Sequence, residues 1–298
     1  MKKHLIIILF FVCFISASGQ NEIDLLPRIA LTTIAQINQG NSCITFPTDI
    51  GNIEALWFEA NLKPNFYIRQ SKNSRLMAVL TPQIIIRMYQ EESFPVRTPS
   101  YMPQVTLYYL LNEKKNSRSL NLFGRVGHHS NGQDGAFYLE DGSLNLISGN
   151  FATNFLELGL IVTNVNTRFN AYQFFKTSLE IHPKNFIQEE LMGIYSRYRW
   201  HNAFSIFKLS SNNEVNDAKK PSISLKGEMT WMFGDYNNLD VISPDRINLN
   251  LTFYYHPKFL EDIGLFIQYY HGSDYYNMYF DHRLDLLRFG FMTEKLRF

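Results

Sequence analysis

The stretch INLNLTFYYH, residues 247 to 256, alternates between two sets of side chains along its whole length. One set is apolar or aromatic and the other mostly polar: Ile247, Leu249, Leu251, Phe253 and Tyr255 against Asn248, Asn250, Thr252, Tyr254 and His256. Successive side chains of a β-strand point to opposite faces of the sheet, so this period of two predicts a strand with one apolar face. The stretches 56 to 68 and 223 to 233 repeat the pattern.

Weaker alternation predicts further strands, for a total of eleven: 76–89, 103–111, 118–131, 152–164, 170–182, 191–201, 263–271 and 284–294. Strands of ten residues or more are long for a soluble protein, but they suit a tilted strand that crosses a membrane with about 9–11 residues. Their polar faces carry charges such as Arg125, Glu157 and Glu228, which a dry core would not tolerate unpaired. A polar barrel interior would accept them, which favours a membrane barrel over a secreted soluble β-protein.

The composition agrees with a membrane barrel. Aromatic residues make up 15% of the chain, yet no run of eighteen apolar residues that could form a transmembrane helix follows the N-terminal leader. A net charge of +1 gives no electrostatic footprint for nucleic acid. We therefore expect an all-β fold, a transmembrane antiparallel β-barrel of the outer membrane. Because bacterial barrels have an even number of strands, a twelfth strand is predicted within residues 41 to 49.

Three segments are expected along the chain. Residues 1–19 have the features of a signal peptide, since Lys2 and Lys3 precede an apolar core and small residues precede Gln20. Residues 20–40 would form an N-terminal periplasmic segment and residues 41–298 the barrel. Most of the longer connections then fall on the outer side, as in known barrels. The stretch 202–221 does not fit this rule, and it is either a long periplasmic connection or a strand extension.

The stretch VGHHSNGQDG, residues 126 to 135, carries the candidate chemistry. By the alternation, His128 and Ser130 share the apolar, lipid-facing side of their strand, and Asn154 shares that side of the next strand. A serine, a histidine and an asparagine so placed favour nucleophilic catalysis, with Ser130 as nucleophile, His128 as general base and Asn154 orienting the ring. The alternative is a set of polar rim residues without a catalytic role. A metal site of His128 and His129 is disfavoured because adjacent strand residues point to opposite faces.

These residues resemble the outer-membrane phospholipase A family. The resemblance rests on HHSNG at 128–132, TNF at 153–155, SFPVRTPSYMPQ at 93–104 and the final Phe298. It implies a twelve-stranded barrel in the outer membrane that hydrolyses phospholipid acyl esters with the help of calcium, as a phospholipase A1/A2. It also implies that His128, Ser130 and Asn154 are the catalytic residues, and that the site faces the outer leaflet.

The resemblance further implies how Ca²⁺ is held and how the protein assembles. The calcium ligands would be the backbone carbonyl of Gln133 and the side chain of Asn150, where the family usually has a hydroxyl. The acidic residues of the same loop, Asp134, Glu140 and Asp141, are either further ligands or a solvated surface. The active form would be a homodimer, with phospholipid as substrate.

Two other functions remain open at this point. The first is a non-catalytic barrel, either a small channel or an adhesin-like protein, and the second is an acyltransferase that uses the same residues. The interior charges test the channel alternative. Paired charges of opposite sign would fill the pore and argue against a channel, whereas a lining of one sign would favour conduction. The charges in question are Arg125, Arg197, Arg199, Glu157 and Glu228.

Overall fold

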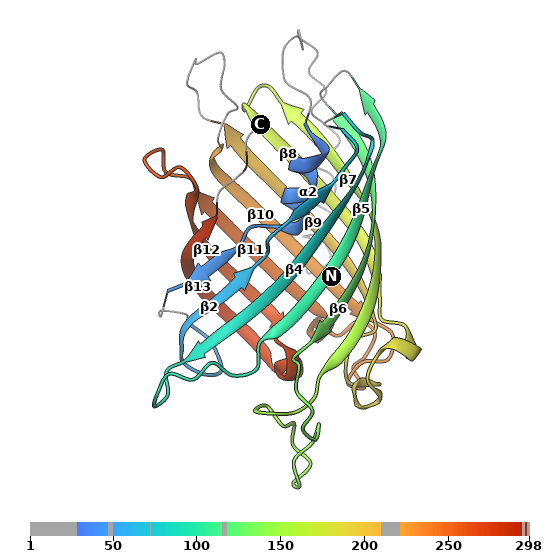
Figure 1. The fold of residues 1–298 in the computed structure, drawn as a ribbon, viewed down its shortest axis with the longest axis vertical. Helices are drawn as coiled ribbons and strands as arrows, with labels where there is room; N and C mark the ends of the chain where they lie inside the picture. Colours follow the sequence, from blue (N-terminus) through green and yellow to red (C-terminus); the bar gives the residue numbers. More distant parts are fainter. Residues whose placement is uncertain are drawn as a thin grey trace, which may run out of the picture.

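The computed structural model describes residues 29–46, 50–71, 73–114, 118–209, 221–293 and 296. The expected signal peptide, residues 1–19, lies outside this range. The described chain forms an all-antiparallel barrel that closes on itself (Figure 1), which confirms the predicted fold. In this part of the chain, no helix is long and apolar enough to cross a membrane.

Thirteen strand segments build the wall, and they occupy twelve positions in it. Their bounds are β1 Cys43–Thr45, β2 Leu56–Leu62, β3 Phe66–Ile68, β4 Leu76–Tyr89, β5 Ser100–Lys114, β6 Arg118–Ser130, β7 Ala152–Asn166, β8 Ala171–Ile181, β9 Tyr198–Leu209, β10 Pro221–Phe233, β11 Ile247–Tyr255, β12 Ile263–Ser273 and β13 Arg283–Thr293. Both β2 and β3 pair with β4, so they share one position. Strand β1 pairs with β13 and with β2 and closes the barrel. The twelfth strand expected within 41–49 is therefore confirmed.

One predicted strand was placed too early in the chain. The alternation at 191–201 predicted a strand there, but β9 runs from Tyr198 to Leu209. The preceding residues belong to a loop whose apolar side chains, such as Leu191 at 0% exposure and Tyr195 at 6%, pack into the outer mouth of the barrel. These packed loop residues mimic the period of a strand. Strand β9 also accounts for residues 202–209 of the stretch left open by the sequence, which are a strand extension.

The side chains on the two faces of the wall differ as the alternation predicts. In β11, the outward Leu249 and Leu251 are 43% and 51% exposed, whereas the inward Thr252 is 2% exposed. In β7, the outward Leu158 is 62% exposed and the inward Glu157 is 3% exposed. An apolar outer band around a polar interior is what a bilayer requires of a barrel.

Buried ion pairs fill the interior. Arg87 lies 2.8 Å from Glu59 and 2.7 Å from Asp274, and all three side chains are nearly inaccessible. Further inward pairs include Arg125–Glu157 at 2.8 Å, Arg199–Glu180 at 3.3 Å and Lys226–Glu228 at 2.7 Å. Arg197 instead donates from Nε to the carbonyl of His182. Opposite charges therefore neutralise one another across the interior.

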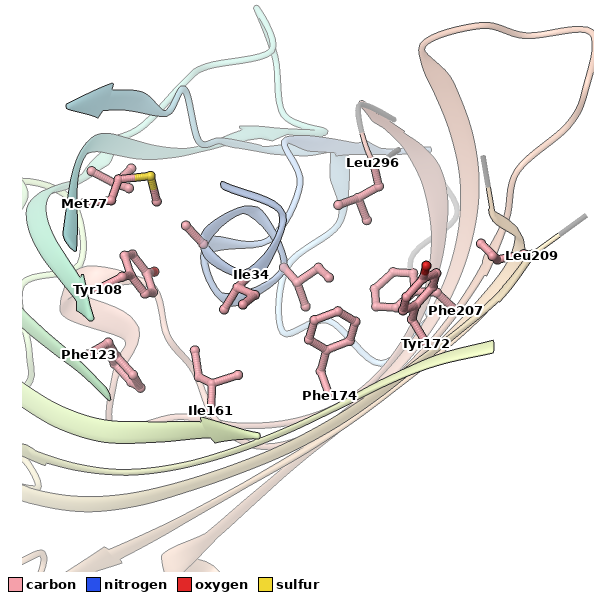
Figure 2. Packing of buried hydrophobic residues seen from close by; sticks show 13 residues of the cluster. Ile34, Met77, Tyr108, Phe123, Ile161, Tyr172, Phe174, Phe207, Leu209 and Leu296 are labelled. Atoms are coloured by element: carbon pink, nitrogen blue, oxygen red, sulfur yellow. The ribbon is translucent and has the colours of Figure 1, made fainter. Parts of the chain in front are cut away.

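A short helix, α2 (Leu31–Gln39), lies inside the barrel. Its apolar side chains, including Ile34 at 2% exposure, contact wall residues on several strands (Figure 2). Gln39 donates to Thr106 Oγ1 at 2.9 Å and accepts from Arg125 at 3.1 Å. Part of the segment 20–40, expected in the periplasm, thus occupies the lumen at the end of the barrel away from Ser130.

Loops fill the opposite end of the lumen. The connection between β12 and β13 contains the short helix η4 (Asn277–Tyr279), and its Tyr276 and Met278 are both 0% exposed. Met278 packs with Phe137 and Phe151 from the connection between β6 and β7. The remaining short helices, η1 Lys184–Phe186, η2 Glu189–Leu191 and η3 Pro244–Arg246, also lie in the connections at this end. Helix α2 and these loops thus occupy the two ends of the interior.

Candidate active site

The candidate residues lie where β6 and β7 reach the loop-rich end of the barrel. The two strands are neighbours, and their register places His128 opposite Asn154 and Ser130 opposite Ala152. His128 Nδ1 lies 2.9 Å from Asn154 Oδ1, within hydrogen-bonding distance. Both side chains point outward, since the residues that alternate with them, His129 and Thr153, are 7% and 0% exposed. The structure thus brings together the predicted histidine and asparagine on the lipid-facing side.

Ser130 is the next outward residue of β6 after His128, and it is half-buried. Residues two apart on one strand face are separated by about 6–7 Å at Cα, a distance that two side chains can bridge. No hydrogen bond joins Ser130 to His128 in the described part of the chain. Catalytic hydrogen bonds are often long without substrate and tighten when it binds. The spacing along β6 therefore places Ser130 near His128 without a hydrogen bond between their side chains.

Asn131 holds the two ends of the following loop together. It is 1% exposed, and its Nδ2 donates to the carbonyl of Gly149 at 2.7 Å. Its Oδ1 accepts from the backbone N–H of Phe151 at 3.0 Å and from that of Gln133 at 3.3 Å. The sequence predicted only a turn at Asn131-Gly132. The turn is present, with φ +68° at Gly132, but the contacts of Asn131 with Gly149 and Phe151 span 18 and 20 residues and leave no local sequence signal.

The two candidate calcium ligands lie at the base of this loop. Gly135 and Gly149 form a parallel bridge, and the Asn150 N–H donates to the carbonyl of Gly135 at 3.1 Å. A side chain at Gly135 would lie 2.4 Å from the carbonyl of Ser148, so the close approach of the two segments requires glycine. The carbonyl of Gln133 and the side chain of Asn150 are thereby held in neighbouring segments. Both offer the hard oxygen atoms that Ca²⁺ prefers.

Of the acidic residues of the loop, Glu140 and Asp141 lie further from its base, whereas Asp134 lies between Gln133 and Gly135. Asp134, Glu140 and Asp141 are all exposed. Asp141 accepts hydrogen bonds from Ser143 N at 2.9 Å and from Ser143 Oγ at 2.6 Å. These bonds favour the ionised carboxylate and lower its pKa. Asp141 is thus engaged in a local turn.

A buried polar network lies on the inward side of the same strands, and the sequence analysis did not identify it. Thr153 Oγ1 lies 2.8 Å from His182 Nδ1, and His182 Nε2 lies 3.0 Å from Glu180. Burial lowers the pKa of His182, while the hydrogen bond to Glu180 opposes the shift. His129 packs against Phe151 with ring centroids 4.7 Å apart. His129 and His128 therefore occupy opposite faces, as expected.

Comparisons with known proteins find similarity in structure but not in sequence. No family profile and no curated protein match the sequence. Outer-membrane phospholipase A from Escherichia coli superposes with a TM-score of 0.59 at 13% identity, covering 90% of this chain and 99% of that chain. An active-site mutant of the E. coli protein, with an asparagine replaced by alanine, gives a TM-score of 0.56 at 12% identity, over 93% and 95% of the two chains.

A third similar structure is the Salmonella typhi outer-membrane phospholipase dimer with bound calcium. Its TM-score is 0.54 at 13% identity, with coverage of 93% of this chain and 95% of that chain. At sequence identities this low, the likeness of the structures supports a common fold. The chain is therefore an outer-membrane β-barrel with the fold of outer-membrane phospholipase A, and the resemblance first drawn from its motifs is confirmed at that level.

Proposed function

We propose that this barrel hydrolyses acyl esters of membrane phospholipids in a calcium-dependent reaction of the phospholipase A1/A2 type. One observation carries the proposal: His128 and Asn154 are hydrogen-bonded on the lipid-facing side of the wall, and Ser130 is the next outward residue. Unsatisfied polar groups are disfavoured on a lipid-facing surface. A histidine, an asparagine and a serine in this arrangement match the residues required for nucleophilic ester cleavage.

In the proposed reaction, Ser130 Oγ attacks the ester carbonyl carbon while His128 Nε2 accepts the hydroxyl proton. The tetrahedral intermediate collapses, and His128 returns the proton to the departing alcohol, which is a lysophospholipid. Water then attacks the acyl-serine while His128 accepts its proton, and when this second intermediate collapses, His128 returns the proton to Ser130 Oγ and the fatty acid leaves. Asn154 holds the imidazole ring in place during both steps.

Calcium would be held at the loop base by the carbonyl of Gln133 and the side chain of Asn150. The donor set fits, because Ca²⁺ takes six to eight oxygen ligands and accepts backbone and amide carbonyls together with water. When bound, the ion would supply positive charge near the carbonyl oxygen that becomes anionic. The Salmonella typhi protein of the same fold was crystallised as a calcium-bound dimer.

We further propose that the active form is a homodimer. The site opens toward lipid, and on a single barrel an acyl chain would lie against only one protein wall. A second barrel would provide the opposite wall, and ligand sites usually enclose most of their ligand. The loop-rich end of the barrel would face the outer leaflet.

The channel alternative is disfavoured by the interior. Paired charges fill the lumen, and α2 and the outer loops occupy its two ends. An acyltransferase would use the same three residues, with an alcohol or amine acceptor taking the place of water. The two reactions therefore differ in the product that leaves the acyl-serine.

The deciding experiment measures fatty-acid release from phospholipid in detergent micelles. Wild type and Ser130→Ala are compared, each with calcium and with a chelator. Activity of the wild type alone, and only with calcium, is the expected result. Folded but silent wild type would contradict hydrolysis, and acyl transfer to an added alcohol in the same assay would identify the transferase instead.

A further inference from the structure

Strand β7 extends beyond the end of its neighbour β8. The pairing of the two strands begins at Leu156 and Ile181, so Ala152 to Phe155 have no partner in β8. Residues 182–188, which we name the strap, take its place along this edge. The Gln188 N–H donates to the carbonyl of Ala152 at 3.1 Å, and the Ala152 N–H donates to Gln188 Oε1 at 3.1 Å. The strap thereby completes the edge of β7 beside the candidate site.

The strap also contacts the side chain of Asn154. Asn154 Nδ2 lies 2.9 Å from the carbonyl oxygen of Phe186. A carbonyl oxygen only accepts hydrogen bonds, so the amide nitrogen of Asn154 must face the strap and its Oδ1 must face His128. Because Oδ1 also only accepts, the hydrogen between the two residues must sit on His128 Nδ1. The other ring nitrogen, Nε2, is then left with the lone pair that a general base needs.

We propose that the strap sets the tautomer of His128 through the Phe186 carbonyl, and that Gln188 is the positioning residue that holds the strap against β7. The inference rests on the proposed function. It also gives a reason for an amide at position 154, where hydrolases of this type often carry a carboxylate. A carboxylate has no hydrogen to donate and would face the Phe186 carbonyl oxygen with like partial charge.

The base of the strap is anchored separately from its tip. The His182 N–H donates to the carbonyl of Arg197 at 2.8 Å, and Arg197 Nε donates back to the carbonyl of His182 at 3.0 Å. His182 Nδ1 also lies 2.8 Å from Thr153 Oγ1. The far end of the strap is held by the Gln188 side chain, by the Gln188 N–H and by a bridge between Ile187 and Thr153. Replacing the Gln188 side chain removes one of these contacts and should therefore loosen the tip and leave the base in place.

The first test reads the tautomer directly, by ¹⁵N NMR of the full-length barrel in micelles. The chain has 8 histidines, and the His128 signals are identified by their loss in His128→Gln. We expect the Nδ1–H tautomer in wild type and a mixture of tautomers in Asn154→Ala and Gln188→Leu. Gln188→Glu retains the acceptor oxygen and should restore the wild-type signal, while Glu189→Gln, an exposed neighbour, serves as control. An Nε2–H tautomer in wild type would overturn the inference even if Gln188→Leu fails to fold.

The second test is a double-mutant cycle on phospholipid hydrolysis. Loss of one hydrogen bond should lower kcat of Gln188→Leu about 3- to 10-fold, with KM unchanged. In the Asn154→Ala background, the same change should have little further effect, because the strap acts through Asn154. Equal losses in both backgrounds would assign Gln188 a general structural role and refute the proposal. An inactive wild type that still shows the Nδ1–H tautomer would refute the proposed function and leave the strap assignment standing.

Discussion

His128 and His129 are adjacent residues of the same type, and the wall of the barrel gives them opposite environments. His128 faces outward, is partly exposed and hydrogen-bonds to Asn154. His129 faces inward, is 7% exposed and packs on Phe151. The same contrast runs along β6 and β7, where outward residues form the apolar band and the candidate site, and inward residues form ion pairs. The outer face thus carries the proposed chemistry, and the inner face supplies polar packing that holds the wall.

The largest predicted effect is a difference in activity between variants of the two histidines. His128→Ala should lower kcat for phospholipid by about 10³-fold or more, because it removes the general base. His129→Ala should retain activity within a few-fold, but it empties a packed interior position and should lower the free energy of unfolding by about 1–3 kcal/mol. Fatty-acid release and urea unfolding, measured on both variants, give the comparison. Similar activity losses in both would show that the two faces do not divide chemistry from packing in this way.

The second prediction concerns the inner face alone. Arg87→Ala leaves the buried Asp274 and Glu59 with less compensation, so it should lower the free energy of unfolding by about 3–5 kcal/mol. The fraction of folded barrel can be followed by heat-modifiable mobility on a gel. Activity per folded barrel should stay close to wild type, because Arg87 lies in β4 and its ion-pair partners, Glu59 and Asp274, are not residues of the candidate site. A stable Arg87→Ala barrel would mean that the ion pairs contribute little to the fold.

The third prediction concerns the partner of His128. Asn154→Ala should lower kcat about 10- to 100-fold, as expected for losing a hydrogen bond to a ring that becomes charged during the reaction. Stability should change by less than about 1 kcal/mol, because the residue lies on the outer surface. Steady-state kinetics together with urea unfolding test both parts. An unchanged kcat would place Asn154 among the polar rim residues.

The smallest effect is predicted for β11, where it tests whether the outward face is lipid-facing and the inward face polar on the far side of the barrel as well. Leu249→Asp places a charge on the lipid-facing side of β11 and should cost about 1–2 kcal/mol, since basic residues cost about 2–4 kcal/mol at mid-membrane and acidic ones less. Asn248→Asp is the matched control, because it keeps the Oδ1 acceptor that the Ser273 N–H uses at 2.9 Å. Folding yield into lipid vesicles is the measurement. Equal yields of the two variants would contradict the assignment of faces on β11.

Much of this protein could be predicted from local sequence, because strand alternation is a local property. The period of two gave the strands, their faces and the outward placement of His128, Ser130 and Asn154. The error at 191–201 has the same origin, since Leu191 and Tyr195 pack inside the outer loops and extend the alternation ahead of β9, which begins only at Tyr198. A short strand such as β1, with three residues, was reached only through the even-number rule for barrels.

Contacts between distant segments were decided by the closed barrel. Asn154 and the Phe186 carbonyl are 32 residues apart, and Arg87 and Asp274 are 187 residues apart. Helix α2 was part of a segment expected in the periplasm, and only the closed wall shows that it lies in the lumen. Residue order along a strand fixes which face each side chain takes, because the backbone geometry repeats every two residues. Which distant partner meets that side chain depends on how the strands close and the loops fold back, and those arrangements exist only in three dimensions.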